Sequence, residues 1–242
     1  MSKVTYEIIK KDERLFFYDG KQYVLFDSGF VAQRKNNSAS VSGRIGPFPT
    51  NVMPKTFFTE FINLTMDDGQ TVTAVLNPMD GYNCFLEGGK ITITDEEIEC
   101  PKHVYFFEFV HSWLALIEGE CNGRSGRFFF DSGARMTMFC RREFASAKPL
   151  RSYREWMAQL YKYDDLSVFS VELAFPNGFS RRGEGAWVTD PIYAAMANSM
   201  NILAVLGIDI FQQYDLCFAV NSKRRGIALM EKTDGAVNAS EK

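Results

Sequence analysis

The tripeptide Asp-Ser-Gly occurs twice in this chain, each time at the end of an apolar stretch that a tight turn introduces. The first copy, Asp27-Ser28-Gly29, follows two apolar runs separated by Asp19-Gly20. The second copy, Asp131-Ser132-Gly133, follows two apolar runs separated by Asn122-Gly123. Asp-Gly and Asn-Gly favour the positive φ angles of two-residue hairpin turns. Both stretches therefore predict the same unit, a β-hairpin whose second strand ends at an aspartate.

The similarity continues downstream of each aspartate, where further strand-like runs and turns follow in the same order. A strand over 71–75 leads to Asn77-Pro78 in the first copy, and a strand over 185–188 leads to Asp190-Pro191 in the second. A repeated order of elements over about a hundred residues predicts two similar lobes of ordinary domain size. We expect an N-terminal lobe over 1–112, a C-terminal lobe over 113–232 and a disordered tail over 233–242.

Composition excludes several classes of protein. The chain has 242 residues, 46% of them hydrophobic, and a formal charge of −3, so it can bury a large core but has no general attraction to nucleic acid or to anionic membranes. The apolar stretches 104–117 and 192–211 are interrupted by polar residues and predict no membrane span. The first residues lack the apolar core of a secretory signal, so a cytoplasmic location is expected.

The cysteines and histidines argue against a metal site. Five cysteines, an odd number, form no Cys-x-x-Cys pair, and the chain has only two histidines, His103 and His111. Free thiols in a reducing compartment are therefore expected, with no metal and no cofactor. Both histidines lie in an apolar connecting stretch, where a packing role is expected.

The periodicity predicts a mainly β protein with few and short helices. The clearest predicted helix begins at Ser152, which could form a capping box with Glu155. A second is expected over 208–214 and another short one after Phe139. Asp209 is expected to cap or orient the helix over 208–214.

Two aspartates at the ends of buried strands can perform chemistry if their loops face each other. Two carboxyl groups within hydrogen-bonding reach share one proton, because both cannot ionise easily at that distance. The ionised carboxylate can then take a proton from a water molecule while the protonated one polarises a carbonyl group. Asp27 and Asp131 are therefore the candidate catalytic residues.

The second motif resembles a known family. Phe128-Phe129-Phe130-Asp131-Ser132-Gly133-Ala134, followed later by an apolar run ending in Leu206-Gly207, is similar to retropepsin-type aspartic peptidases. The resemblance implies a mainly β, two-lobed, pepsin-like or retropepsin-like acid protease barrel fold with a few short helices. It also implies an aspartic endopeptidase that hydrolyses peptide or protein substrates with the dyad Asp27 and Asp131. The supporting residues that it implies are Ser28, Gly29, Ser132, Gly133, Ala134, Leu206 and Gly207.

The first half departs from the family pattern in two places. The nearest match to the apolar-apolar-Gly element there is Cys84–Gly89, which Glu87 interrupts, and Phe30 takes the position that Ala134 has in the second half. The flap, a hairpin that closes over bound peptide in this family, could come from 41–46. Because the predicted helix from Ser152 fills the equivalent region of the second half, a flap is expected in the first half alone.

These departures leave three interpretations open. The presence of two motifs in one chain favours a monomeric peptidase with a complete dyad. A catalytically inactive peptide-binding module on the same fold is the first alternative. A homodimeric enzyme that uses only Asp131 from each chain is the second.

Overall fold

A computed structural model describes most of the chain, namely residues 3–11, 13–29, 33–35, 38–40, 64–65, 71–72, 74–146, 148–157 and 162–232. Most of these residues lie in β-strands. The elements of the first half are β1 (Val4–Lys11), β2 (Arg14–Tyr18), β3 (Tyr23–Phe26), β4 (Gln33–Lys35), β5 (Ser38–Ser40), β6 (Leu64–Thr65), β7 (Thr71–Val72), β8 (Ala74–Leu76), the 3-10 helix η1 (Pro78–Asp80), β9 (Asn83–Glu87), β10 (Lys90–Thr94) and β11 (Tyr105–Glu108).

The second half has a similar content of strands. Its elements are β12 (Leu116–Cys121), β13 (Arg124–Phe130), β14 (Met138–Phe139), η2 (Arg142–Phe144), β15 (Arg151–Met157), β16 (Lys162–Ala174), β17 (Ser180–Trp187), α1 (Pro191–Ser199), β18 (Ile202–Leu206), η4 (Ile208–Phe211), β19 (Asp215–Ala219) and β20 (Gly226–Met230). The prediction of a mainly β chain with a few short helices is confirmed.

Two hairpins lead the chain to Asp27 and Asp131, as the sequence predicts. β2 and β3 form the first hairpin, and β12 and β13 form the second. In the first turn Gly20 has a φ of 95°, and in the second turn Asn122 and Gly123 have φ of 49° and 77°. Gly and Asn adopt such left-handed conformations more readily than other residues. Both turns therefore follow from the local sequence.

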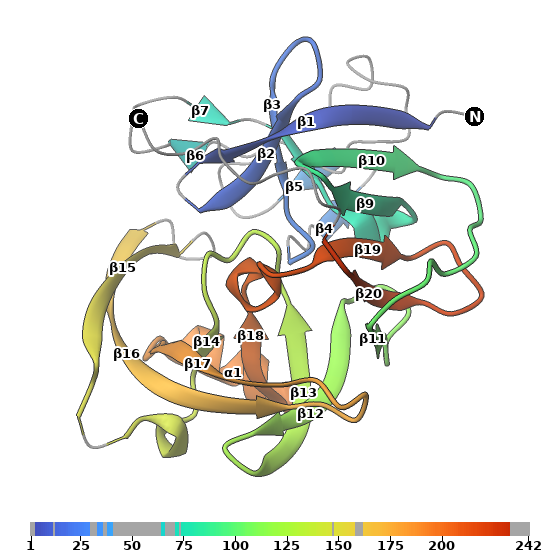
Figure 1. Cartoon of the computed structure of the whole chain (residues 1–242). Helices are drawn as coiled ribbons and strands as arrows, with labels where there is room; N and C mark the ends of the chain where they lie inside the picture. The colour runs from blue at the N-terminus through green and yellow to red at the C-terminus, as the bar shows by residue number, and fades with distance from the viewer. Residues whose placement is uncertain are drawn as a thin grey trace.

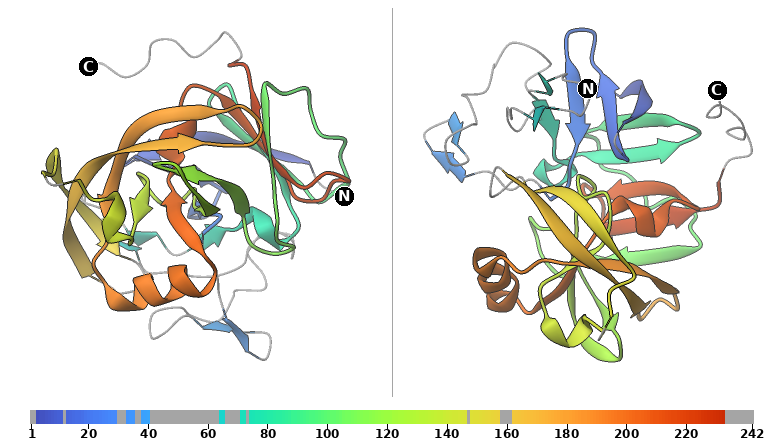
Figure 2. Two further views of the ribbon diagram at one scale, coloured as in Figure 1. Left: turned by 90° about the horizontal axis from the view of Figure 1, so that it is seen from below. Right: turned by 90° about the vertical axis from the view of Figure 1, so that its left-hand side faces the viewer.

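The strands form two large sheets. The nine-stranded sheet has the order β11-β20-β19-β9-β10-β1-β2-β3-β8, and the seven-stranded sheet has the order β12-β13-β18-β14-β17-β16-β15. In Figure 1 the strands of the first half make the upper body and those of the second half the lower body. The right-hand view of Figure 2 shows the same division. The predicted two-lobed arrangement is confirmed.

The last two strands of the chain cross from one body to the other. β19 and β20 follow β18 of the second half, yet β19 pairs with β9 of the first half, with Cys217 opposite Phe85. Both figures place β19 and β20 between the two bodies. The boundary between the two lobes at residues 112 and 113 stays a prediction. The pairing of β19 with β9 adds the last strands of the chain to the sheet of the first half, which the order of the sequence does not reveal. The expected tail, 233–242, lies outside the described residues.

Each strand that ends at an aspartate has a parallel neighbour. β3 runs parallel to β8, and β13 runs parallel to β18. The main-chain N–H of Asp27 donates a hydrogen bond of 3.0 Å to the carbonyl oxygen of Leu76, and that of Asp131 donates one of 2.9 Å to Leu206. Each half therefore has one parallel pair of strands whose ends lie behind its aspartate.

This pairing corrects two sequence-based matches. The strand that corresponds to β8 is β18, and not the strand around 185–188 to which the sequence order assigns it. Cys84–Gly89, the candidate for the apolar-apolar-Gly element, instead forms β9 and the turn to β10. The short apolar runs of this chain are alike in composition, and only the parallel pairing identifies which of them lies behind the aspartate.

Aromatic rings form the core beneath the two aspartates. Phe26 and Phe130 immediately precede the aspartates and are fully buried. The ring of Phe218, on β19, lies 5.3 Å from that of Phe26 and 5.4 Å from that of Phe130. Aromatic pairs at such distances contribute about 1 kcal/mol each beyond the area that they bury. One ring from the crossing strand β19 therefore packs against both halves of the site.

The helix expected from Ser152 is wrong. Residues 151–157 form β15, which pairs antiparallel with the 13-residue strand β16. Ser152 is exposed and Glu155 is buried, as the alternation of a strand requires, so the two residues form no capping box. Pairing with a long neighbouring strand outweighs the intrinsic preference of a short segment, which is weak for both helix and strand.

The remaining helices are short. The helix expected over 208–214 is the shorter 3-10 helix η4, and η2 is the short helix expected after Phe139. α1 is not predicted from the apolar pattern, although Asp190-Pro191 is a suitable start: the Asp190 side chain accepts a hydrogen bond from the main-chain N–H of Tyr193, at 3.2 Å. Of the helices in the described residues, none has the length and apolar character needed to cross a membrane.

Candidate active site

The structure brings the two Asp-Ser-Gly loops together. The main-chain N–H of Ser28 donates to Oγ of Ser132 at 2.9 Å, and the main-chain N–H of Ser132 donates to Oγ of Ser28 at 3.0 Å. Each hydroxyl then donates across the boundary, Ser28 to the carbonyl oxygen of Phe130 at 3.0 Å and Ser132 to that of Phe26 at 3.1 Å. Both serines are almost completely buried. Four reciprocal hydrogen bonds therefore hold the loops of the two halves face to face.

The two motif glycines allow the close approach of the aspartates. A Cβ atom added to Gly29 would overlap Cγ of Asp131, and one added to Gly133 would overlap Cγ of Asp27. Real Cβ atoms do not approach other heavy atoms so closely. Each glycine thus lies directly against the carboxyl group of the opposite motif, and any side chain there would displace it.

Main-chain N–H groups orient the two carboxyl groups, which are half-buried. Oδ1 of Asp27 accepts a hydrogen bond of 2.9 Å from Gly29. Oδ1 of Asp131 accepts bonds of 2.9 Å from Gly133 and 3.2 Å from Ala134. The position that corresponds to Ala134 in the first half is Phe30, which lies outside the described residues.

The two carboxyl groups are close enough to share a proton. Burial raises the pKa of Asp27 well above its usual value, and the charge of Asp131 and a hydrogen bond to Asp131 raise it further. Burial also raises the pKa of Asp131, while hydrogen bonds from Asp27 and from the main chain of Gly133 and Ala134 lower it. The two groups titrate as a pair, with one proton held between them over the range between their ionisations.

Leu206 and Gly207 pack behind the second aspartate. Leu206 accepts the hydrogen bond from Asp131, and the carbonyl oxygen of Ala134 accepts one of 3.1 Å from the N–H of Ile208. A Cβ added to Gly207 would lie 2.5 Å from the carbonyl carbon of Met136. Glycine is therefore required at position 207 because two backbones cross there.

In the first half Asn77 stands where Gly207 stands in the second. It follows Leu76, the parallel partner of Phe26, just as Gly207 follows Leu206. The Asn77 side chain is buried, and its Oδ1 accepts a hydrogen bond of 2.9 Å from the N–H of Met79, which starts η1. The two halves therefore use different residues for the same change from strand to 3-10 helix.

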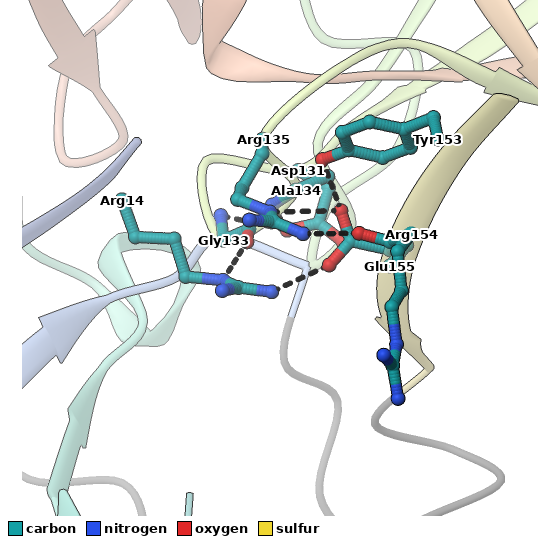
Figure 3. A network of polar contacts seen from close by, with 8 residues as sticks. All are labelled: Arg14, Asp131, Gly133, Ala134, Arg135, Tyr153, Arg154 and Glu155. Atoms are coloured by element: carbon teal, nitrogen blue, oxygen red, sulfur yellow. Dashed lines mark hydrogen bonds and ion pairs between the residues drawn. The ribbon is translucent and has the colours of Figure 1, made fainter. Parts of the chain in front are cut away.

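Sequence reasoning missed an ion network beside the second loop (Figure 3). Oε1 of Glu155, on β15, lies 2.6 Å from a terminal nitrogen of Arg14, on β2. Oε2 of Glu155 accepts bonds of 3.2 Å from Nε of Arg135 and 2.6 Å from the hydroxyl of Tyr153. Nε of Arg14 also donates to the carbonyl oxygen of Gly133, at 3.1 Å. The network thus joins both halves to the loop that carries Asp131.

Two signals in the sequence could have indicated this network. Arg14 directly precedes the apolar run Leu15-Phe16-Phe17, where a charged side chain must be either at the strand end or paired. Glu155 falls on the inward-facing positions once 151–157 is read as a strand.

The hairpin of β15 and β16 lies where the sequence predicts a helix, so the reason for restricting a flap to the first half is removed. The flap candidate 41–46 lies outside the described residues.

The other residues considered from the sequence lie elsewhere. Asp209 is half-buried in η4, and burial raises its pKa to about 6. Its main-chain carbonyl oxygen accepts a hydrogen bond of 2.9 Å from Arg181, and the capping or orienting role of its side chain stays a prediction. His103 packs on the ring of Phe106, and its Nδ1 lies 2.8 Å from the carbonyl oxygen of Pro101. All five cysteines are free, as expected.

Comparison with known proteins gives a limited result. No protein-family model and no curated protein matches the chain. Among solved structures, the chain is similar to an aspartic proteinase from Irpex lacteus, at 9% sequence identity and a TM-score of 0.48, with 98% of this chain and 100% of that one covered. The mainly β, two-lobed architecture, with one Asp-Ser-Gly loop in each lobe, is established by the strand pairing described above.

Proposed function

We propose that the protein is an aspartic peptidase that hydrolyses peptide bonds with a water molecule activated by Asp27 and Asp131. The observation that carries the proposal is the reciprocal hydrogen bonding of Ser28 and Ser132, which has no evident purpose other than to hold two carboxyl loops together. A pair of half-buried carboxyl groups that share a proton is suited to acid and base catalysis in one step.

The two aspartates take different roles in this mechanism. Asp131, which accepts two main-chain hydrogen bonds, is the ionised member and removes a proton from the water. Asp27, which accepts a single main-chain hydrogen bond, is the protonated member and donates its proton to the substrate carbonyl oxygen. The water oxygen attacks the carbonyl carbon to give a tetrahedral intermediate. Asp131 then passes the proton that it took from the water to the leaving nitrogen, Asp27 recovers its proton from the former carbonyl oxygen, and the C–N bond breaks.

The supporting residues fix this geometry. Ser28 and Ser132 brace the loops, Gly29 and Gly133 allow their approach, and Ala134, Leu206 and Gly207 pack behind the second loop. These contacts are all made within one chain, which favours a monomeric enzyme over a dimer that uses only Asp131 from each copy. The substrate is a peptide or an unfolded segment of protein.

A catalytically inactive peptide-binding module is the second candidate. It is favoured by the unequal halves, since Asn77 replaces the glycine that the second half uses at the strand crossing. Both candidates require a peptide to lie across the two loops, and they differ in whether the peptide is cleaved.

The test compares the wild-type protein with Asp27→Asn and Asp131→Asn, using a mixture of peptides from a digested proteome and mass spectrometry of the products. We expect cleavage by the wild type and a loss of at least about a thousandfold in each variant, because either change removes one of the two proton-transfer groups. Asp165→Asn, which alters an exposed carboxylate on β16, serves as the control and should cleave normally.

The outcome distinguishes the two candidates. Equal turnover by Asp131→Asn and the wild type would exclude the mechanism. Binding of a statine-type inhibitor without cleavage of any peptide would instead support the inactive binding module.

A further inference from the structure

Glu155 is a buried carboxylate that bridges charged groups from three parts of the chain. Its side chain is 3% exposed, and that of Arg14 is 9% exposed. Arg14 comes from β2 in the first half, Arg135 from the segment after Gly133, and Glu155 from β15 (Figure 3). Burying charged groups is costly even when they are paired, and such pairs are often replaceable by apolar side chains without loss of stability. A network of this kind therefore calls for a role other than stability.

The guanidinium group of Arg14 makes two different contacts at once. Its terminal nitrogen lies 2.6 Å from Glu155, and its Nε donates to the carbonyl oxygen of Gly133. Gly133 in turn lies against the carboxyl group of Asp27 and donates its own N–H to Asp131. Arg14 thus contacts the one residue of the second loop that touches both aspartates.

The two halves differ at the position of Arg14. Arg14 lies two residues before Phe16, and Leu114 lies two residues before Leu116. Phe16 and Leu116 are equivalent, because each pairs with the residue two positions before an aspartate. The second half therefore presents a buried leucine where the first half presents an arginine. The two loops share the serine contacts equally, but among the described residues the brace from the opposite lobe reaches the Asp131 loop alone.

We propose that Arg14, anchored by Glu155, is a positioning residue that holds the Asp131 loop in place from the opposite lobe. This inference rests on the proposed function where it concerns catalysis, but the placement of the loop can be measured without it. A lysine could not replace Arg14, because one ammonium group cannot reproduce a planar fork that contacts Gly133 and Glu155 together.

The charge of Arg14 also acts on the aspartates. It lowers the pKa of both Asp27 and Asp131, opposing the effect of their burial. A further ionisable group near the pair is the hydroxyl of Tyr193, on α1, whose pKa is raised by burial and by the charge of Asp131. Loss of the positive charge at position 14 should therefore move the titration of the pair to higher pH.

The test uses Arg14→Lys, Arg14→Met and Glu155→Gln, each first checked for folding by near-ultraviolet circular dichroism. The matched controls are Arg124→Lys and Glu143→Gln, since Glu143 also contacts two arginines, Arg124 at 2.7 Å and Arg141 at 3.7 Å, but on the surface. Three quantities are measured in every protein: the amide shifts of Ser132, Gly133 and Ala134, the carboxyl carbon titration of Asp27 and Asp131 by NMR, and kcat and KM on a peptide that the wild type cleaves.

We expect Arg14→Lys and Glu155→Gln to move the Gly133 amide resonance and to lower kcat about tenfold, with KM changed less than about twofold. Arg14→Met should in addition move the carboxyl titration to higher pH. The controls should change none of these quantities.

Unchanged Gly133 resonances in Arg14→Lys and Glu155→Gln would overturn the proposal. So would a loss of folding in all three variants while the controls fold, because the network would then serve stability alone. If the wild type cleaves no peptide while the Gly133 resonance and the titration still respond, the positioning role stands and the peptidase function fails.

Discussion

Ser28 and Ser132 each use one hydroxyl group for two hydrogen bonds that cross between the halves of the chain, one accepted and one donated. The partners are main-chain atoms in all four bonds. The separation of the two aspartates is therefore determined by backbone positions, and does not depend on the rotamer of a long side chain.

Removal of either hydroxyl should loosen this junction. Ser28→Ala leaves the buried N–H of Ser132 and the buried carbonyl of Phe130 without these partners, and each such group costs about 1–3 kcal/mol. We expect the free energy of unfolding in urea to fall by at least about 2 kcal/mol for Ser28→Ala and for Ser132→Ala. Ser125→Ala, which removes an exposed contact to Glu120, is the control and should change it by less than about 0.5 kcal/mol. Equal effects in all three variants would contradict the bracing role.

A methyl group at Gly29 should disrupt the carboxyl pair. In Gly29→Ala the new Cβ would overlap the carboxyl group of Asp131, so that group must move. We expect kcat/KM on a cleaved peptide to fall at least about a hundredfold, since displacement by about 1 Å has effects of that size. Gly183→Ala is the control, because its Cβ would meet nothing closer than 3.7 Å. Normal activity of Gly29→Ala would mean that the pair is not the site of reaction.

Stability should depend on the ionisation of Asp27. Its pKa in the folded protein lies above that of an unfolded chain, so its contribution to stability is present below about pH 4 and is lost as the pH rises through the folded value. An asparagine side chain at this position carries no charge at any pH. Asp27→Asn should therefore be more stable than the wild type at pH 7, by about 1.4 kcal/mol for each pH unit between the unfolded pKa and either the folded pKa or pH 7, whichever is lower.

The measurement for this prediction is urea unfolding at pH 4 and at pH 7. The advantage of Asp27→Asn should shrink toward zero at the lower pH. A variant that is less stable than the wild type at pH 7 would show that the carboxylate of Asp27 is favoured in the folded protein.

The pH profile of cleavage should lie in the mildly acidic range. The reaction needs Asp131 ionised and Asp27 protonated, and burial raises the pKa of both groups above that of an isolated carboxyl. The low-pH limb of kcat/KM should thus follow the first ionisation of the pair and the high-pH limb the second. A rate maximum below about pH 3 would be incompatible with these directions, given the usual carboxyl value of about 4.

Much of this architecture could be predicted because it depends on neighbouring residues. Gly20 and the Asn122-Gly123 turn define two hairpins, and the apolar runs after them can only be buried strands that end at Asp27 and Asp131. The resemblance of the second half then predicts that Leu206 and Gly207 lie behind the Asp131 loop, next to which β18 ends. In each case a short stretch of sequence contains the whole physical cause.

The remainder depends on contacts between distant residues. Asn77 precedes η1 in the first half, at the position where Gly207 precedes η4 in the second half. The strand that lies behind Asp27 therefore has no glycine by which the sequence could identify it. Glu155 follows Ser152 at the spacing of a helix cap, and only the pairing of β15 with β16 turns its side chain inward. Arg14 and Glu155 are separated by most of the molecule in sequence, and no local pattern connects them.

The return of β19 and β20 to the sheet of the first half has a practical consequence for dissecting the molecule. A fragment that stops before Asp215 would leave β9 without its partner strand β19 and would remove Phe218 from under both loops. A fragment that starts after the first half would contain β19 and β20 without the sheet of the first half to which they belong. Separately expressed halves of this chain should therefore not fold on their own. When the two fragments are combined, they should regain the native fold only by complementing each other.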